Sequence, residues 1–458
     1  MSIESKLLLP TLIHMQSRFG KDLHLVTVQE LVDQDMIFVE DGNHGEYRPL
    51  QHEFTREGVP FIRPPDLKNG KIDFDSCDHI NEVAFKRVRK GIGHGGDIVL
   101  THRATVGRLA ITSIEDPLFV TNPGTTIWRS LNDKVLDQKY LYYFMCSPAF
   151  MEQLTSEVGN NCTFDYVSLT QQRGLLVALI PIAKQHAIAN MLRSLDDKIE
   201  LNRRMNETLE AMARAIFKSW FVDFDPVRAK ADGREPAGMD AETAALFPDS
   251  FEETELGMIP NGWKIKSLDE IADFLNGMVM QKFPPEGEDF LPVIKIAELH
   301  RGNTIGSDRA SSNIDPRYII EDGDILFSWS GSLEVCIWCG GKGALNQHLF
   351  KVTSADYPKW FYYFWLKEHL PQFQMIAAGK ATTMGHIQRY HLREAEVVIP
   401  ITPLLERVNI IIQSLIQRII KNNLESRSLS SIRDALLPKL LSGDVKVEAA
   451  RMNLGTKL

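Results

Sequence analysis

The sequence has few cysteines, no long apolar run and no signature of a secreted protein. Its 458 residues contain 5 cysteines, an odd number scattered along the chain, which is typical of a protein kept in a reducing cytosol. No apolar run approaches the roughly 18 residues that a membrane-spanning helix needs. The first residues, MSIESKLLLPTL, lack the long apolar stretch and cleavage site of a signal peptide. We therefore expect a cytoplasmic location.

Motifs for catalysis are also missing. No GxxxxGK[ST] loop occurs, so a nucleotide-driven motor in this chain is not expected. Neither Asn-Pro-Pro nor Asp-Pro-Pro followed by an aromatic residue occurs, and no amino-methyltransferase site is visible. Cys336 and Cys339 form a single CxxC in an apolar run, which favours strand residues over a zinc or redox site. The glycine-rich stretch at residues 91–96 precedes a strand and favours a loop over a cofactor site. We predict no catalytic residue, no metal site and no bound cofactor.

Acidic residues outnumber basic residues, but their distribution is uneven. The formal net charge is −9, which argues against a uniformly basic DNA-binding protein. Residues 223–260 hold 10 acidic and 3 basic residues, a net of −7, so most of the excess negative charge lies in that segment. Locally basic DNA-binding faces are therefore compatible with the composition, and partner proteins could neutralise part of the phosphate charge.

The chain repeats itself at an offset that shrinks gradually. Residues 23–31 resemble residues 263–271, an offset of 240 (263 − 23), and Ile180-Pro181 recurs as Ile399-Pro400, an offset of 219 (399 − 180). Between them, GDIVL at 96–100 resembles GDILF at 323–327. Each repeat begins with strand-type segments separated by turn residues and ends on a long helix opened by proline. The order of the matches predicts one duplicated unit.

The two long helices carry narrow apolar seams. From Leu192 to Trp220 the seam advances 28 residues in 8 steps, a mean of 3.5, which is the coiled-coil period. The first seam comprises Ile188, Leu192, Leu195, Ile199, Asn202, Met205, Leu209, Met212, Ile216 and Trp220, and the second Ile412, Leu415, Ile419, Asn422, Leu429, Ile432, Leu436 and Leu440. The seams most simply bury each other in an antiparallel pair; the alternative is that each helix packs on its own globule. Pro438 is expected to end or kink the second helix.

These patterns predict an α+β fold with internal duplication. Two strand-rich domains are separated by a long antiparallel two-helix coiled coil and related by pseudo-two-fold symmetry. The predicted parts are a first strand-rich domain at 1–180, a first spacer helix at 181–222, an acidic linker at 223–260, a second strand-rich domain at 261–399, a second spacer helix at 400–445 and a C-terminal tail at 446–458. The linker composition predicts an extended connection over the surface rather than a core.

Several polar loops are candidates for recognition. Small hydroxyl residues, amides, histidines and basic residues can contact phosphates and base edges. The candidates are Asn43, His44, Lys86, Arg87, Arg89, Thr101, His102, Arg103, Ser328, Trp329, Ser330, Lys380, Thr382, Thr383 and His386. Plain hairpin turns and solvated loops are the alternatives. Asp196 and Asp197 are expected on a solvated helix face, and not as nuclease carboxylates.

The arrangement resembles the specificity subunit of type I restriction–modification enzymes. The likeness rests on the linker at 221–263, on GDILFSWSGSLE, LNQHLFKV and TTMGHI, and on the repeated domain-then-helix layout. It implies two target-recognition domains that read the halves of a split DNA sequence. It also implies a helical spacer, at ~1.5 Å per residue roughly 50 Å long, that sets the gap. Two methyltransferase (modification) subunits and the restriction motor-nuclease subunits would supply S-adenosylmethionine, ATP and magnesium.

Two rival interpretations stay open at this point. One is the specificity subunit of a type IIB-like enzyme, in which methyltransferase and nuclease share one partner chain. The other is a protein–protein scaffold, which the acidic charge favours slightly. Asn202 and Asn422 interrupt the two seams at the same repeat position, an offset of 220 (422 − 202). Polar residues at such positions can set helix register at a cost in stability, and the alternative is a wet edge of the seam.

Overall fold

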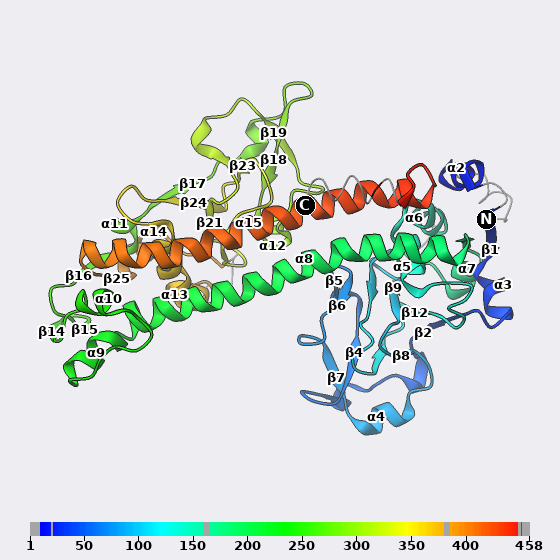
Figure 1. Cartoon of the computed structure of the whole chain (residues 1–458), viewed down its shortest axis with the longest axis horizontal. Helices are drawn as coiled ribbons and strands as arrows, with labels where there is room; N and C mark the ends of the chain where they lie inside the picture. The colour runs from blue at the N-terminus through cyan, green and yellow to red at the C-terminus, as the bar shows by residue number, and fades with distance from the viewer. Residues whose placement is uncertain (1–9, 20–21, 159–164, 380–384, 448–449, 451–458) are drawn as a thin grey trace. The chain divides into compact units, whose positions relative to one another are not determined.

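The chain forms two compact units of mixed helix and sheet. The computed structural model describes residues 10–19, 22–158, 165–379, 385–447 and 450. Unit 1 consists of Met1–Asp197 and Leu429–Leu458, and unit 2 of Lys198–Ser428. In the described part of the chain both units contain sheets, short helices and a stretch of each long helix (Figure 1). The predicted α+β class is confirmed.

Unit 1 is built on two sheets and a strand pair. One sheet has the order β10-β9-β12-β2, a second has the order β3-β7-β4-β11-β8, and β1 pairs with β13. A hairpin, β5 (Leu67–Lys68) with β6 (Lys71–Ile72), lies beside β10, where the Ile111 N–H donates to the Gly70 carbonyl at 3.0 Å. The other strands are β1 (His24–Thr27), β2 (Ile37–Asp41), β3 (Phe54–Thr55), β4 (Val59–Ile62), β7 (Asp78–Ile80), β8 (Ile92–Gly93), β9 (Ile98–Thr101), β10 (Leu109–Ile111), β11 (Phe119–Thr121), β12 (Thr125–Ser130) and β13 (Leu176–Leu179).

Unit 2 repeats this topology. Its four-stranded sheet β17-β24-β21-β22 matches β2-β12-β9-β10 read in the same direction, and β16 pairs with β25 as β1 pairs with β13. The central pair β18 and β23 is parallel, as is the pair β4 and β11. The strands are β14 (Phe251–Thr254), β15 (Gly257–Pro260), β16 (Lys264–Ser267), β17 (Asp273–Asn276), β18 (Phe290–Ile294), β19 (Arg309–Ser311), β20 (Ile319–Ile320), β21 (Ile325–Ser328), β22 (Val335–Ile337), β23 (Gly343–Leu345), β24 (Leu349–Thr353) and β25 (Glu396–Ile399). The predicted duplication is therefore confirmed.

An aromatic helical segment packs on the sheets of each unit. In unit 2 it is one helix, α13 (Lys359–Ala378), which contains Pro371. In unit 1 the same segment is two helices, α5 (Gln138–Cys146) and α6 (Pro148–Ser156). The break falls at Ser147-Pro148, because proline lacks the N–H that would continue α5 but suits the first position of a new helix. The segment is therefore divided in unit 1 and continuous in unit 2.

The remaining short helices connect strands. Thr27 caps α3 by accepting the backbone N–H of Glu30, whose carboxylate in turn accepts the N–H of Thr27. Ser267 and Glu270 form the equivalent capping box at α11. The helices are α2 (Pro10–Phe19), α3 (Val28–Asp33), α4 (Glu82–Arg87), α7 (Leu169–Arg173), α9 (Asp225–Ala231), α10 (Ala241–Ala245), α11 (Leu268–Ile271), α12 (Ile296–Arg301) and α14 (Arg389–Glu394).

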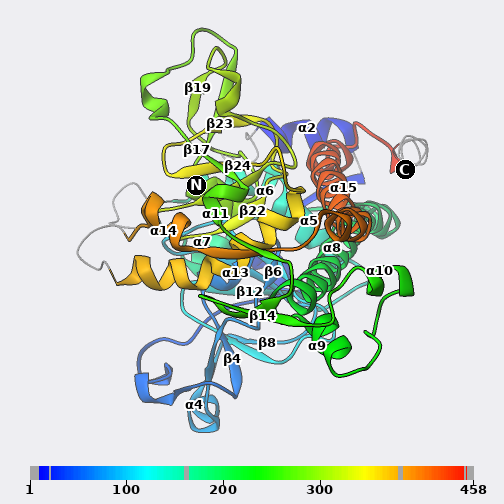
Figure 2. The ribbon, with the colours of Figure 1, turned by 90° about the vertical axis from the view of Figure 1, so that its left-hand side faces the viewer.

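The long helices are α8 (Ile182–Phe217) and α15 (Thr402–Leu441). Within unit 2 their segments are antiparallel: Asn202 lies beside Ser426, while Asn206, one turn later, lies beside Asn423. Figure 2 shows α8 and α15 viewed nearly along their axes. Within each unit both helices also contribute to the domain core, so both predicted arrangements are present together.

The predicted seam positions need three corrections. Met212 is 50% exposed and Ala213 is buried in its place. A straight helix drifts relative to a strict 3.5 repeat, so Ala213 and Phe217 take over the seam as α8 enters the core of unit 2. Pro438 lies inside α15, three residues before the helix ends at Leu441 (441 − 438), so the end predicted near this proline falls one turn later. Asp197 is exposed as expected, but Asp196 is half-buried and accepts hydrogen bonds from Tyr143 and Arg433.

The acidic linker is part of a core and is not an extended surface connection. A π-helical turn at Lys218–Val222 places Trp220 and Phe221 in the apolar cluster of unit 2. The linker's own Phe224, Val227 and Phe247 are buried in the same cluster. The prediction of a surface connection was wrong because it rested on the average acidic composition, to which these few large apolar residues contribute little.

Candidate nucleic-acid interface

Unit 2 brings three loops together at the ends of its strands. The first follows β21, the second precedes β24 and the third precedes α14. Ser330 of the first loop pairs by a backbone bridge with His386 of the third, and its Oγ lies 2.9 Å from Nδ1 of His348 in the second. The Trp329 ring lies 5.9 Å from that of His348 and 6.4 Å from that of His386. Segments from three parts of the sequence thus form one polar and aromatic face.

Ser328 and Trp329 hold this face in shape. The Ser328 hydroxyl is buried, accepts the N–H of Glu334 at 2.8 Å and donates to the Ser332 carbonyl at 2.7 Å, which closes the loop. The Trp329 indole N–H donates to Asn276 Oδ1 at 2.9 Å. The predicted Lys380, Thr382 and Thr383 lie outside the described residues.

Unit 1 places the equivalent loops in the same relation. Arg103 bridges to Tyr166 as Ser330 bridges to His386. The His102 ring lies 5.6 Å from that of Tyr166, and its Nδ1 is 3.0 Å from the Val167 carbonyl. Burial lowers the pKa of His102, so its ring is neutral at neutral pH. Thr101 is buried and donates its hydroxyl to the Thr105 carbonyl, which closes this loop as Ser328 closes its counterpart. The loops that follow the matching strands GDIVL and GDILF are therefore equivalent in the two units.

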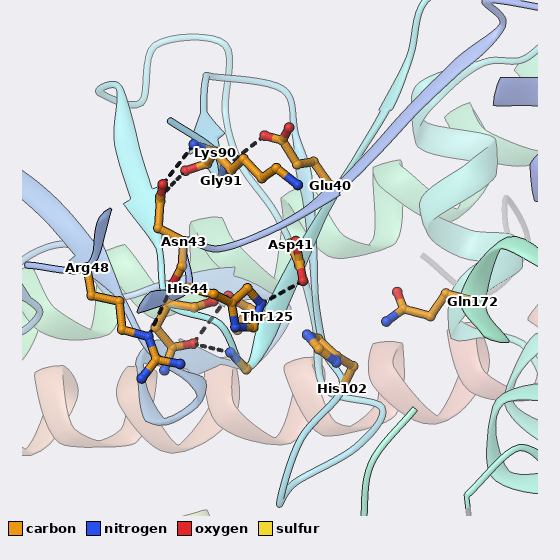
Figure 3. A network of polar contacts seen from close by, with 12 residues as sticks. Glu40, Asp41, Asn43, His44, Arg48, Lys90, Gly91, His102, Thr125 and Gln172 are labelled. Carbon is orange, nitrogen blue, oxygen red and sulfur yellow. Dashed lines mark hydrogen bonds and ion pairs between the residues drawn. The ribbon is translucent and has the colours of Figure 1, made fainter. Parts of the chain in front are cut away.

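Asn43 is a buried clamp between the end of β2 and a basic segment. Its side-chain oxygen accepts the backbone N–H groups of Arg89 at 2.7 Å and Lys90 at 3.0 Å, and its amide donates to the Lys90 carbonyl (Figure 3). Glu40 holds the next residue by accepting the Gly91 N–H at 2.8 Å. The amide that we expected to face a base edge is therefore engaged within the chain. His44 is exposed beside it, with Nε2 at 2.9 Å from Asp41 Oδ2.

The basic run at the end of α4 divides into structural and free members. Arg87 forms a paired contact with the buried carboxylate of Glu53 and donates to the Arg48 carbonyl at 3.1 Å. The guanidinium holds the pKa of Glu53 at about 2. Lys86 forms an exposed ion pair with Glu82 at 2.7 Å. Arg89 is exposed, and in the described part of the chain its guanidinium has no protein partner.

Arg48 and Arg103 line one cleft in unit 1. The cleft has a volume of about 450 Å³, and Asn122 and Gly124 lie in its wall between the two arginines. Both arginines are exposed, and neither guanidinium faces a carboxylate among the residues that the structure describes. Sequence analysis missed Arg48 and Asn122, because their neighbours in the cleft are 55 and 19 residues away (103 − 48 and 122 − 103).

Other residues of the faces were missed for the same reason. Tyr166 in unit 1 and Gln347 and His348 in unit 2 were not predicted, although the strand matches GDIVL and GDILF pointed to this end of the sheet. Unit 2 also has a cleft of about 450 Å³, lined by Gly331, Ser332, Gln374 and Gly385 beside the end of α13.

The predicted register residues lie on facing helices inside unit 2. Asn202 and Asn422 are buried. The Asn202 amide donates to Glu425 Oε2 at 2.9 Å and to Ser426 Oγ at 3.3 Å. The Asn422 amide donates to Asn206 Oδ1 at 2.9 Å. The side-chain oxygens of Asn202 and Asn422 are buried without a hydrogen-bond partner. The alternative of a wet seam edge is therefore wrong.

Two further observations concern the whole described chain. No helix in the described ranges is long and apolar enough to cross a membrane. Among the same residues, no three His, Cys, Asp or Glu side chains lie close enough together to hold a metal ion. Cys336 lies on β22, where burial raises the pKa of its thiol.

The fold and the paired faces define a duplicated α+β protein. A family model for the type I restriction modification DNA specificity domain matches residues 39–211 and again residues 260–430. The chain therefore belongs to the family of type I restriction–modification DNA specificity proteins, and the resemblance noted in the sequence is confirmed. The two matched stretches coincide with the two copies of the repeated topology.

Relatives of similar length support this assignment. The chain is 27% identical over 413 residues to the type I restriction enzyme MjaIX specificity subunit of Methanocaldococcus jannaschii, covering 86% of this chain and 89% of the relative. It is 27% identical over 440 residues to the type I restriction enzyme HindI specificity subunit of Haemophilus influenzae, covering 84% and 94%. The solved S subunit of a type I restriction–modification system from M. genitalium aligns over 92% of this chain and 96% of its own, with 16% identity and a TM-score of 0.48.

Proposed function

We propose that this chain gives a type I restriction–modification complex its DNA sequence specificity, with each unit reading one half of a split target. The observation that carries the proposal is the same three-loop face built twice with different side chains. Arg103 and Tyr166 occupy in unit 1 the positions that Ser330 and His386 occupy in unit 2. Because the two faces present different hydrogen-bonding groups, the two half-sites need not be identical or palindromic.

The catalytic work would belong to partner subunits. Two modification subunits would carry S-adenosylmethionine and methylate adenine in double-stranded DNA, and restriction motor-nuclease subunits would use ATP and magnesium. The family assignment supports such partners, and the sequence lacks motifs for nucleotide hydrolysis and methyl transfer. A complex that acts on cellular DNA would work in the cytoplasm. The type IIB-like alternative is not favoured, since the relatives are type I specificity subunits.

The helix pair would set the gap between the half-sites. α8 has 36 residues and α15 has 40. In unit 2, Asn202 and Asn422 form polar contacts across the pair that only one alignment of the helices satisfies. Such buried polar contacts favour a single register over slipped alternatives. We therefore propose that these two residues fix the register and, through it, the gap length.

A methylation experiment tests the whole proposal. The chain is expressed together with its modification partner in cells free of other adenine methylation, and methylated adenines are mapped across the genome. The expected result is one split sequence of two defined halves and a constant gap. A gel shift with the purified complex is the companion measurement. If the complex assembled but bound DNA without sequence preference, the proposal would be wrong.

A scaffold for proteins is the competing function class. It predicts that the complex binds no DNA selectively and that variants in the two faces leave methylation unchanged. As a control for the two faces, Thr208→Leu lies on the exposed surface of α8 and should leave the target unaltered.

A further inference from the structure

The polar side chains of the unit 1 cleft are mainly hydrogen-bond donors, and the acceptor among them, Asn122 Oδ1, already holds a backbone N–H. Arg48 uses its Nε to donate to the Asn43 carbonyl at 3.3 Å, which leaves both terminal nitrogens of the guanidinium available. The Arg103 guanidinium has no protein partner in the described ranges. Asn122 Oδ1 already accepts the Gly124 N–H at 3.0 Å, whereas its amide nitrogen has no hydrogen-bond partner in the described ranges. These are the polar side chains of the cleft lining.

The arginines of the cleft differ from those nearby. Arg87 pairs with Glu53, Arg129 pairs with Asp97 at 2.5 Å and Arg63 pairs with Asp78 at 2.6 Å. When an arginine pairs with a carboxylate, the N–H donors of its guanidinium are occupied and its charge is compensated. Arg48 and Arg103 instead keep free donors, and both line the same cleft.

Arg48 is also held in place by its surroundings. The Arg87 guanidinium donates to the Arg48 carbonyl, while the buried Glu53 fixes Arg87. The Asn43 carbonyl fixes Arg48 Nε. Because the Arg48 guanidinium is oriented before a ligand binds, less side-chain entropy is lost on binding. Asn43 and Arg87 are therefore positioning residues in this scheme.

The chemistry of a cleft lined mainly by donors selects among the bases. In the major groove guanine presents two acceptors, N7 and O6, while adenine and cytosine each present an amino donor. Thymine presents a single acceptor, O4, beside a methyl group, so it can pair with fewer of the donors than guanine. An amino group directed at a guanidinium would meet no acceptor, and the buried pair of donors would carry a desolvation cost. Phosphate oxygens are also pure acceptors, but the cleft walls include the apolar Phe54, Phe61 and Pro64. Such walls suit the edge of a stacked base better than a hydrated phosphate.

We infer that Arg48 and Arg103 read a guanine in the half-site recognised by unit 1. The inference rests on the proposed function and adds to it the base and the residues that select it. Arg103 was among the residues predicted from the sequence to contact DNA, and Arg48 was not.

The test uses the complex of the full chain with its modification partner. Arg48→Ala and Arg103→Ala are compared with the unchanged chain by mapping methylated adenines. Arg108→Ala is the matched control, because Arg108 is an exposed arginine of the same hairpin that does not line the cleft. The expected result is that one guanine position in a single half-site becomes tolerant of other bases, with discrimination falling roughly 10- to 100-fold, as for loss of one bidentate contact. The other half-site and the gap stay unchanged.

Each contrary outcome is distinct. If the unchanged complex marks no split sequence, the proposed function itself fails, and this inference fails with it. If it marks a split sequence but neither half contains a guanine that these variants affect, the inference alone is overturned. Methylation that falls uniformly with the sequence preserved, and with a salt dependence weakened by about one unit of slope, would assign the arginines to phosphates and would also overturn it.

Discussion

Replacing Asn202 and Asn422 together with leucine should make the helix pair more stable and less selective in register. Both side chains are buried, and both have an oxygen without a hydrogen-bond partner. An unpaired buried oxygen costs about 1–3 kcal/mol, so two of them represent several kcal/mol of stability that the native sequence gives up. Leucine removes both oxygens and adds apolar burial at about 1.5–3 kcal/mol for each side chain.

The substitution also removes hydrogen bonds, which reduces the gain. The Asn202 amide donates to Glu425 and the Asn422 amide donates to Asn206, each at 2.9 Å. Each bond contributes about 1 kcal/mol. Glu425 and Asn206 are only partly buried and can regain water as a partner. At the lower end of these contributions we expect a net stabilisation of about 3 kcal/mol, which for a unit of this size raises the melting temperature by about 6–12 °C.

The double substitution is also expected to change the length of the gap between the two half-sites. A uniformly apolar seam satisfies more than one alignment of the helices, because the contacts that only one register can make are gone. The methylation map of the Asn202→Leu, Asn422→Leu complex should show the same half-sites with added gap lengths. Thr208→Leu adds the same side chain on the exposed face of α8 and should change neither quantity. An unchanged melting temperature together with an unchanged, single gap would refute the reasoning.

Three further predictions test other parts of the structure. Inserting four residues, about one helical turn, near Leu209 should change the gap and spare both half-site sequences, and an unaltered gap in the methylation map would contradict the spacer model. Phe247→Ala should destabilise unit 2 by about 3–5 kcal/mol, because its buried ring packs with its centroid 5.5 Å from that of Trp220. A thermal melt that shows no loss of stability would contradict the assignment of the linker to the core. The pKa of Glu53 falls from 4.5 to about 2 on folding, so its pairing with Arg87 stabilises unit 1 above pH 4.5 and is lost as the pH falls toward 2. Glu53→Gln should therefore lower stability at neutral pH and flatten the acid unfolding curve over that window, whereas a parallel curve would show that the ion pair is not involved.

The positions of several predicted contact residues show where sequence reasoning stops. Asn43 and Arg87 have the chemistry of DNA-contacting residues, and both occur in polar segments next to strands. In the folded chain Asn43 binds backbone groups 46 and 47 residues away, and Arg87 binds a carboxylate 34 residues away. Nothing local distinguishes a side chain with such a distant partner from one that is free. Arg48, which has no carboxylate partner in the described ranges, was overlooked for the same reason.

The linker was predicted to lie on the surface because the prediction used its average composition. A composition average over 38 residues (260 − 223 + 1) gave weight to its acidic side chains. Phe224, Val227 and Phe247 are a small fraction of the segment, yet they bury their side chains in the core of unit 2. Whether an isolated aromatic residue is buried depends on the surface that the rest of the chain offers, and the π-helical turn with Trp220 supplies it.

The sequence by itself determined the duplication, the long helices and the family. These features appear as local or periodic patterns: short strand sequences that occur twice, an apolar seam with a period of 3.5 residues, and asparagines at equivalent seam positions. Such periods follow from backbone geometry alone. Only the tertiary structure decided which polar residues are free to face DNA. Exposure, ion pairing and the placement of Arg48 and Arg103 in one cleft depend on contacts between segments far apart in the chain. Those contacts form only when the strands of each unit assemble into sheets, which places the loops at the strand ends next to one another.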